Sequence, residues 1–200
     1  MSNITAKMVA DLREKTGLPM MEIKKALSET NGDEAKAIEL MHKKGLSKAE
    51  KRAERETKSG RVETYLHSNG RIGVLVEVLS ETDFVAKSDE FREFIHNLAL
   101  QIAGMAPKYV SREDIPAEIL TEKKKKFAGE ISKPADITAK IVSGKLEKFY
   151  SEICLLDQKY IKDEDLKISD LLSKLIAKIG EKIVISRFCR FEVGAGDDKI

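Results

Sequence analysis

The sequence predicts an α+β protein, in which a small bundle of three helices precedes a core with a three-stranded antiparallel sheet covered by helices. Two observations support this class. Apolar residues recur at helical spacing through about the first 45 positions, and strand patterns then appear in Val62–Ser80 and Lys182–Val193. Helical patterns fill the chain between these strands, so the sheet is expected to pack against helices.

Composition narrows the possible functions. A chain of 200 residues is long enough for one or two domains with a sizeable core. Its 36 Lys and Arg residues nearly balance its 34 Asp and Glu residues, which leaves a formal charge of +2. No overall field therefore draws the protein onto nucleic acid or a membrane, and a partner must be recognised by shape and local chemistry.

Cysteine usage and hydropathy indicate a cytoplasmic protein. Cys154 and Cys189 are too few for a disulfide scaffold and match no CxxC pattern, so reduced thiols are expected. Met1–Ala10 lacks the apolar core of a signal peptide. The longest stretch without a charge, Phe94–Pro107, is short for a membrane span. We expect the chain to remain in the cytoplasm, away from membranes.

The first helix is predicted by its ends. Ile4 and Val9 flank Thr5 as a hydrophobic staple does, which places the helix start at Thr5. Gly17 is expected to end it. The stripe between them consists of Met8, Val9 and Leu12.

Two more helices complete a module over residues 1–56. Pro19 suits the first position of the second helix, Asn31–Asp33 turns the chain into the third, and Gly45 is expected to end that helix. Ser47–Lys58 alternates in charge and offers only alanines as an apolar face, which is typical of an exposed helix or linker. We therefore predict a boundary near Thr57, with the core in residues 57–200.

The sheet is predicted from alternation and one turn. Val62, Thr64 and Leu66 share one face of a first strand, and Ser68–Gly70 signals a tight hairpin. The return strand, Ile72–Ser80, has apolar residues on both faces, so we expect it to be interior and buried on much of both sides.

Helices are expected around this sheet. Ser88 caps one whose first turn holds Asp89 and Glu90. Pro116 and Pro134 open two more, and Cys154 on the second is expected to be buried. The apolar positions of these helices and of a last one are Phe91, Phe94, Ile95, Leu98, Ile102, Ile137, Ile141, Phe149, Ile153, Leu156, Leu172, Leu175, Ile176 and Ile179. Cys189 falls on a possible edge strand near a subunit contact.

The segment Ser80–Asp89, with the sequence SETDFVAKSD, connects the return strand to the next helix and carries a bulky ring beside a carboxylate. Connections usually run over the surface and shed large apolar groups. Asp83 and Phe84 are therefore either a core plug or a contact surface for another molecule. Spacing alone favours the plug, with Phe84 folded back onto Phe91 and Phe94.

No catalytic, metal or nucleotide motif is complete. His42, His67 and His96 are scattered, with no HExxH pattern, so a zinc site is not expected. Gly144-Lys145 resembles the end of a phosphate-binding loop, but its segment is helical in pattern and lacks the first glycine. Residues 45–49 nearly match a nucleophile elbow but follow no strand. We expect no cofactor and no chemistry of the chain's own.

The lysine run Lys123–Lys126 is the main candidate for phosphate contacts. A run of four charges beside Phe127 is more often the solvated face of a helix, so no nucleic-acid partner is expected.

A set of short motifs covers nearly the whole chain: Leu12–Gly17, Met20-Met21, Lys24–Leu27, Gly32-Asp33, Lys43–Gly45, Val76–Val78, Glu81–Ala86, Gly144–Leu146, Phe149-Tyr150, Glu152, Cys154–Leu156, Gln158 and Arg187–Phe191. Together these motifs resemble the elongation factor Ts family, guanine-nucleotide exchange factors for elongation factor Tu in bacteria and organelles. Leu18-Pro19 departs from the small, Gly-containing pair usual in the family.

This resemblance implies a role for the segment Thr82–Val85. In the family, the corresponding loop inserts into the GTPase domain of elongation factor Tu, beside helices that support the magnesium site. Phe84 would be the wedge, and Asp83 would position the loop and disturb groups near the metal. Thr82 and Val85 would hold the loop's shape. The factor would thereby promote GDP release and allow GTP to bind.

The resemblance also implies further contacts. The N-terminal part is similar to a ubiquitin-associated (UBA-like) module, with Leu12, Met20 and Met21 as apolar contacts to elongation factor Tu. The alternative is that all three are core residues, although helical geometry turns at least one of the adjacent methionines outward. Family members of this short kind carry one core unit instead of two, so a homodimer formed through the core is expected.

Two other classes remain open. An adaptor, ubiquitin-like or RNA-binding, would use the three-helix module and Lys123–Lys126, and a small enzyme would need a pocket with a paired acid and base. Neither explains why Asp83 and Phe84 lie on a connection.

Overall fold

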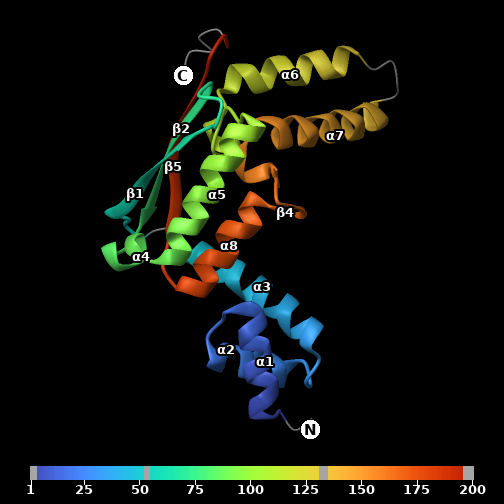
Figure 1. Cartoon of the computed structure of the whole chain (residues 1–200). Coiled ribbons are helices and arrows are strands. Elements are labelled where there is room, and N and C mark those ends of the chain that lie inside the picture. Colours follow the sequence, from blue (N-terminus) through green and yellow to red (C-terminus); the bar gives the residue numbers. More distant parts are fainter. Residues whose placement is uncertain (1–3, 52–54, 131–134, 196–200) are drawn as a thin grey trace. The chain divides into compact units, whose positions relative to one another are not determined.

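A computed structural model describes residues 4–51, 55–130 and 135–195 (Figure 1). The chain forms two compact units. The first combines Met1–Gly60 with Leu79–Phe91 and Leu171–Val184, and the second contains Arg61–Val78, Arg92–Asp170 and Ile185–Ile200. The fold is α+β, as predicted.

The N-terminal bundle consists of α1 (Ala6–Thr16), α2 (Met20–Glu29) and α3 (Glu34–Lys51). Thr5 caps α1 as predicted, because its Oγ1 accepts a 3.3 Å hydrogen bond from the Met8 amide. Gly17 ends α1 in the left-handed conformation at φ 67°, which favours glycine. The buried core of the bundle is Val9, Leu12, Ile23, Ala26, Leu27, Ala37 and Met41, and Ile4 packs against it.

Two boundaries of the bundle differ from expectation. Pro19 is the cap before α2 rather than its first residue. Helix α3 continues through Gly45 to Lys51, so the predicted end at Gly45 is wrong. A glycine inside a helix costs only about 1 kcal/mol, which the strong helix formers around it can offset. Residues 52–54 of the predicted charged segment lie outside the described residues.

The main sheet has the order β1-β2-β5 and is antiparallel. Its strands are β1 (Ser59–Leu66), β2 (Ile72–Ser80) and β5 (Ile183–Glu192). The predicted hairpin joins the first two, because the His67 amide donates to the Ile72 carbonyl oxygen at 2.9 Å and Gly70 turns the chain at φ 67°. The return strand β2 is central, as its apolar pattern predicts.

The expectation that β2 is buried on much of both faces is wrong. Val74, Val76 and Val78 are buried, whereas Leu75 between them is 43% exposed. Helix α5 (Asp89–Met105) runs along one face of the sheet (Figure 1). The opposite face therefore keeps its apolar side chains in contact with solvent.

Helices α6 (Ala117–Gly129) and α7 (Ala135–Ile153) form a hairpin of two neighbouring helices (Figure 1). Pro116 caps α6, and Pro134 lies outside the described residues. Lys124, Lys125 and Lys126 are exposed on α6, as expected of a solvated face. The pattern assigned to one long helix breaks after Ile153, so Leu156 belongs to the short helix η2 (Leu155–Asp157).

Arg112, in the short helix η1 (Arg112–Asp114), links η1 to α7 and η2. It forms hydrogen-bonded ion pairs with Asp157 at 2.6 Å and Glu147 at 2.7 Å, and its guanidinium lies 4.4 Å from the centre of the Tyr150 ring. These charged hydrogen bonds raise the pKa of Arg112 further above its ordinary value, with the bond to Asp157 the largest cause.

The remaining elements are helix α8 (Ile168–Ile179), which was predicted, and a two-stranded antiparallel sheet, which was not. The small sheet pairs β3 (Lys159–Tyr160) with β4 (Asp163–Lys167). Its strands are too short and too polar to give an alternating apolar signal.

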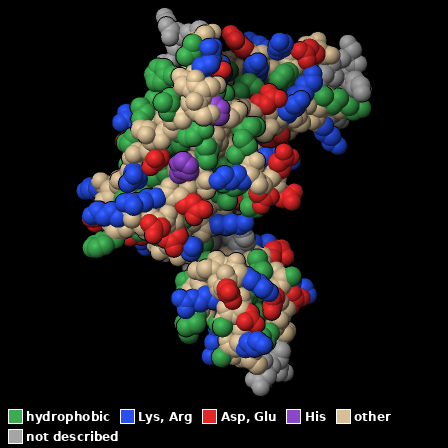
Figure 2. Space-filling model, viewed as in Figure 1, with side chains coloured by type: hydrophobic (Ala, Val, Ile, Leu, Met, Phe, Trp, Pro, Cys, Tyr) green, Lys and Arg blue, Asp and Glu red, His purple; other side chains and the backbone are tan. Residues whose placement is uncertain are grey.

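Acidic and basic side chains are interspersed over the face shown in Figure 2. This mixture accords with a formal charge of +2. Among residues 4–51, 55–130 and 135–195, no helix has both the length and the apolar character needed to cross a bilayer.

Candidate functional site

The segment Thr82–Val85 lies at the start of a short helix, α4 (Asp83–Lys87), directly after the central strand. Thr82 is the cap of this helix and has an extended backbone. Its Oγ1 accepts a hydrogen bond from the Val85 amide at 3.5 Å. The sequence predicted an irregular connection here, so the helix corrects that expectation. A threonine followed by an acidic residue is a signal for the start of a helix. The helix has only five residues, which is too short for a periodic pattern of apolar residues to reveal it.

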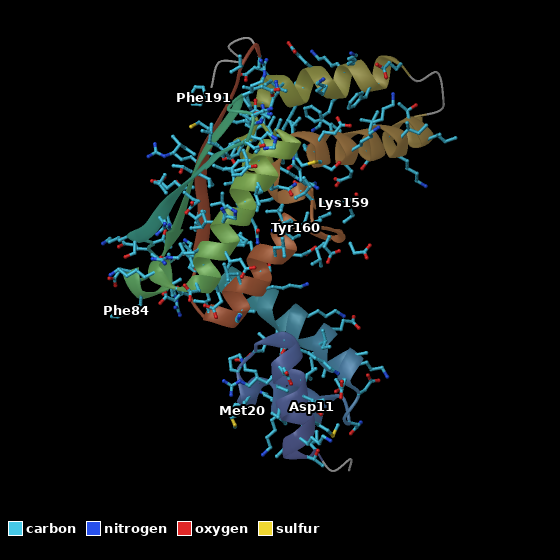
Figure 3. The ribbon with its side chains drawn as sticks, in the orientation of Figure 1. Asp11, Met20, Phe84, Lys159, Tyr160 and Phe191 are labelled. Carbon is cyan, nitrogen blue, oxygen red and sulfur yellow. The ribbon has the colours of Figure 1, made fainter. Side chains whose placement is uncertain are left out.

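Phe84 projects from α4 into solvent. Its side chain is 83% exposed, more than any other large apolar side chain in the described part of the chain (Figure 3). The alternative of a ring folded back as a core plug is therefore wrong. Ala86 is the buried residue of α4, and a five-residue helix with one buried side turns the ring the other way.

The carboxylate of Asp83 is held on the same helix. It accepts a 2.6 Å hydrogen bond from the Lys87 ammonium one turn later. That hydrogen bond, followed by the positive charge of Lys87, lowers the pKa of Asp83 below its ordinary value. Asp83 is thus ionised at neutral pH, with its charge partly balanced.

Val85 and Ser88 fix the end of α4. Val85 is half-buried, and its carbonyl oxygen accepts a 2.8 Å hydrogen bond from the Ser88 hydroxyl. The same hydroxyl oxygen accepts from the Phe91 amide at 3.4 Å, so Ser88 caps α5 as the sequence predicts. The four residues Thr82–Val85 therefore form one ordered turn that presents an exposed aromatic ring and a carboxylate.

Sequence reasoning missed the side chain that holds this turn from outside. Glu181 accepts hydrogen bonds from the amide and the hydroxyl of Thr82, at 3.0 Å and 2.7 Å. The two residues are 99 positions apart, so no local pattern could have paired them.

A second candidate surface lies at the start of α2. Met20, which Figure 3 labels, is 51% exposed. Met21, its neighbour in the first turn, is 76% exposed. Leu12 is different, because it is fully buried in the core of the bundle. Of the three residues expected to contact a partner, only the two methionines are at the surface.

The described residues offer no metal centre. In the ranges 4–51, 55–130 and 135–195, no three His, Cys, Asp or Glu side chains are grouped so that they could hold a metal ion. The features that the site does present are an apolar ring on an ordered turn and a separate pair of methionines. This arrangement suits contact with another macromolecule.

Comparison with known proteins gives one consistent result. The model of the family described as Elongation factor TS matches residues 2–195. The chain is 53% identical over 196 residues to elongation factor Ts of Moorella thermoacetica, which covers 96% of this chain and 97% of that protein. It is 52% identical over 194 residues to elongation factor Ts of Thermotoga maritima, covering 96% and 98% of the two chains.

A third relative covers nearly all of both chains. Elongation factor Ts of Caldanaerobacter subterraneus is 51% identical over 199 residues, which is 98% of this chain and 100% of that protein. Because the family match and these relatives span almost the entire sequence, the chain belongs to the elongation factor Ts family of translation elongation factors.

Proposed function

We propose that this protein binds elongation factor Tu carrying GDP and promotes GDP release, with α4 entering the partner near its Mg²⁺ and phosphate site. GTP then binds to the emptied site. The protein carries out no chemistry and needs no cofactor or nucleic acid, and it acts in the cytoplasm. The observation that supports this proposal most directly is Phe84, 83% exposed on an ordered helix.

Burial of the Phe84 ring supplies part of the free energy of insertion. Burying a Phe side chain contributes about 1.5 to 3 kcal/mol. Each tenfold loosening of GDP needs about 1.4 kcal/mol of differential contact, so Phe84 supplies part of the effect and a wider interface supplies the rest. GDP is held largely through its phosphates and a bridging Mg²⁺, so a small displacement of their supporting elements weakens the nucleotide at its most charged point.

Asp83 acts by position rather than by chelation. A single carboxylate in water competes weakly for Mg²⁺, and Asp83 already accepts a hydrogen bond from Lys87. We assign the main effect to steric displacement by Phe84, while Asp83 positions the turn and disturbs the partner's groups near the metal. Thr82 and Val85 maintain the shape of that turn.

Turnover follows from linkage. A factor that weakens nucleotide binding is itself weakened by nucleotide, by the same coupling free energy. Incoming GTP therefore expels the exchange factor, and the cycle can repeat.

The stopped-flow release of fluorescent GDP from elongation factor Tu tests the proposal. At fixed Mg²⁺, the parent protein should accelerate release, and Phe84→Ala should reduce this acceleration about tenfold to a hundredfold. Ile137→Ala is the matched control, because Ile137 is a 47% exposed apolar residue on α7, outside the surfaces proposed to contact elongation factor Tu. Equal acceleration by the parent and a folded Phe84→Ala variant would exclude Phe84 as the wedge.

Met20 and Met21 form a second contact with elongation factor Tu. Methionine suits such a surface because its side chain adapts its shape. Leu12 contributes from the core beneath, by holding the bundle that presents the two methionines. Calorimetry should show weaker binding by the Met20→Ala, Met21→Ala double variant, with Ile38→Ala as control because Ile38 is 38% exposed on α3. Unchanged affinity in the folded double variant would refute this contact.

We also propose that two copies of the chain associate through the face of the main sheet opposite α5. Leu66, Leu75 and Phe191 are 70%, 43% and 65% exposed. Arg190, the residue before Phe191, donates a hydrogen bond to the Ala103 carbonyl oxygen of α5 at 3.2 Å. Since neighbouring side chains of a strand alternate, Phe191 lies on the face opposite α5. Cys189 shares the face of Phe191 by alternation.

Light scattering at micromolar concentration tests this assembly. The parent should have the mass of a dimer, and Phe191→Asp should have that of a monomer because a carboxylate in an apolar contact is costly. A parent of monomer mass would rule out the homodimer.

A further inference from the structure

Two segments about a hundred residues apart hold each other through reciprocal hydrogen bonds. Glu181 accepts from the Thr82 amide at 3.0 Å, and Glu81 accepts from the Lys182 amide at 2.6 Å. In each case, a glutamate binds the amide of the residue that follows the other glutamate. Both segments belong to the first unit, where one leads from β2 into α4 and the other leads from α8 into β5.

Glu181 makes a second bond to the same threonine, since its Oε1 accepts from the Thr82 hydroxyl at 2.7 Å. A hydroxyl has one proton to donate and two lone pairs with which to accept. With the proton directed to Glu181, the lone pairs remain for the Val85 amide, which donates to Thr82 Oγ1. The carboxylate therefore fixes the threonine in the orientation that caps α4.

The segment is also tied from its other side. Ser80, the last residue of β2, is fully buried, and its hydroxyl donates to the Thr82 carbonyl oxygen at 2.8 Å. The amide, hydroxyl and carbonyl groups of Thr82 are thus all engaged immediately before Asp83.

Phe84 cannot hold its own position by packing, because only 17% of its side chain is covered when 83% is exposed. Where the ring points is decided by the backbone of α4, which is too short to be stable alone. The carboxylate of Glu181 is the contact from a distant part of the chain that binds the cap residue of this helix directly.

We propose that Glu181 is a positioning residue for nucleotide exchange, which holds Thr82 so that α4 presents Phe84 to elongation factor Tu in a preformed orientation. This inference rests on the proposed exchange function. Preorganisation removes the ordering cost from the binding step, so the ring can act as soon as the partner docks. Without Glu181, docking through other surfaces continues, but the ring reaches its site in fewer of the complexes.

The test separates the maximal rate of GDP release from the concentration of factor needed for half of it. Glu181→Ala should lower the maximal rate at least about fivefold and change the half-saturating concentration less than about twofold. General damage to the fold would instead lower the active concentration and leave the maximal rate unchanged. Stopped-flow release at several concentrations of the variant measures both quantities.

Variants at Thr82 provide the matched controls. Thr82→Ser keeps the amide and the hydroxyl, so it should retain more of the maximal rate than a variant without the hydroxyl. Thr82→Val removes the hydroxyl while keeping the shape, and it should lower the maximal rate. Because the hydroxyl bond is shared, Glu181→Ala should then have a smaller effect in the Thr82→Val background than in the parent.

A second measurement needs no partner. Hydrogen exchange of the peptide spanning residues 80–88 should be about tenfold faster in Glu181→Ala than in the parent. If Glu181→Ala does not fold, Glu181→Gln replaces it, because glutamine offers only one acceptor oxygen to the two donors of Thr82. Unchanged protection in the variant, or an unchanged maximal rate, would overturn the inference.

The outcomes distinguish the two proposals. If the parent fails to accelerate GDP release, the exchange function itself is refuted. If Phe84→Ala loses activity while Glu181→Ala retains the full maximal rate, the exchange function stands and the role of Glu181 is refuted.

Discussion

Phe84 and Ala86 lie two residues apart on α4, yet the first is 83% exposed and the second only 7%. A helix of one turn can bury a single narrow side, and here alanine occupies it. Ala86 packs α4 against the protein because it is small, and Phe84 stays exposed and can contact another molecule. The same helix is therefore sensitive to substitution on one side and tolerant on the other.

Substitutions at these two positions should differ in how much they change stability. Ala86→Leu forces extra volume into a packed site and should lower the free energy of unfolding by about 1–3 kcal/mol. Phe84→Ala leaves no cavity, so it should change that free energy by no more than about 0.5 kcal/mol. Urea denaturation followed by circular dichroism measures both. A marked loss of stability in Phe84→Ala would contradict the exposed placement of the ring.

The buried glutamines of the second unit should be essential to stability. Gln101 donates to the Gln158 side chain at 3.1 Å and to the Lys159 carbonyl oxygen at 3.0 Å, and its own oxygen accepts from the Ile161 amide at 2.9 Å. Gln101→Leu removes these bonds from the buried Gln158 side chain and from two partly buried backbone groups, and it should lower the free energy of unfolding by about 2–4 kcal/mol.

The midpoint of urea denaturation measures the effect of Gln101→Leu. Asn97→Ala, on the same helix, is the control. The Asn97 side chain accepts an exposed hydrogen bond from the Lys162 ammonium at 2.7 Å, and such a bond contributes little to stability. Asn97→Ala should shift the free energy of unfolding by at most about 0.5 kcal/mol. Equal midpoints for the two variants would show that the buried network contributes no stability.

The thiol of Cys154 should be unreactive in the folded protein. It is fully buried, and burial together with the negative charge of Asp157 raises its pKa to about 11. The reactive species is the thiolate, of which about one part in a thousand would form at pH 8. A Cys189→Ser variant carries Cys154 alone, so a disulfide reagent should label it only after unfolding in guanidinium. Rapid labelling of the native variant would contradict this placement.

Asp33 should make the bundle sensitive to acid. Its carboxylate accepts from the Lys36 amide at 3.0 Å at the start of α3, and this bond lowers the pKa of Asp33 below its ordinary value of 3.8. A lowered folded-state pKa stabilises the protein fully above 3.8, and the stabilisation is lost as the pH falls through the folded-state value.

Asp33→Asn isolates this effect, because asparagine also caps helices but does not titrate. The melting temperature of the parent should exceed that of the variant at pH 6, and the difference should shrink progressively as the pH falls below 3.8. Other carboxyl groups titrate in both proteins, so they cancel in the comparison. A difference that stays constant from pH 3 to 6 would contradict a role for the charge of Asp33.

The sequence by itself determined the fold class, the three-helix bundle, the hairpin at Gly70 and the helix caps at Thr5 and Ser88. Caps, turns and periodic stripes act over about four residues, so the local sequence contains the groups that form them. The same local signals located the segment Thr82–Val85, and its motif made the family recognisable. They could not place the end of α3, since Gly45 only weakens a helix that its neighbours favour.

Only the tertiary structure decided which side chains face solvent and which groups hold the candidate site. The spacing of Phe84 was compatible with a core plug or with a free ring, and Leu12 was equally compatible with core or surface. Leu75 is exposed because helix α5 covers one face of the sheet, and Glu181 meets Thr82 because α8 leads into β5 beside the end of β2. Such contacts join residues far apart along the chain, so their energies depend on neighbours that no local window of sequence contains.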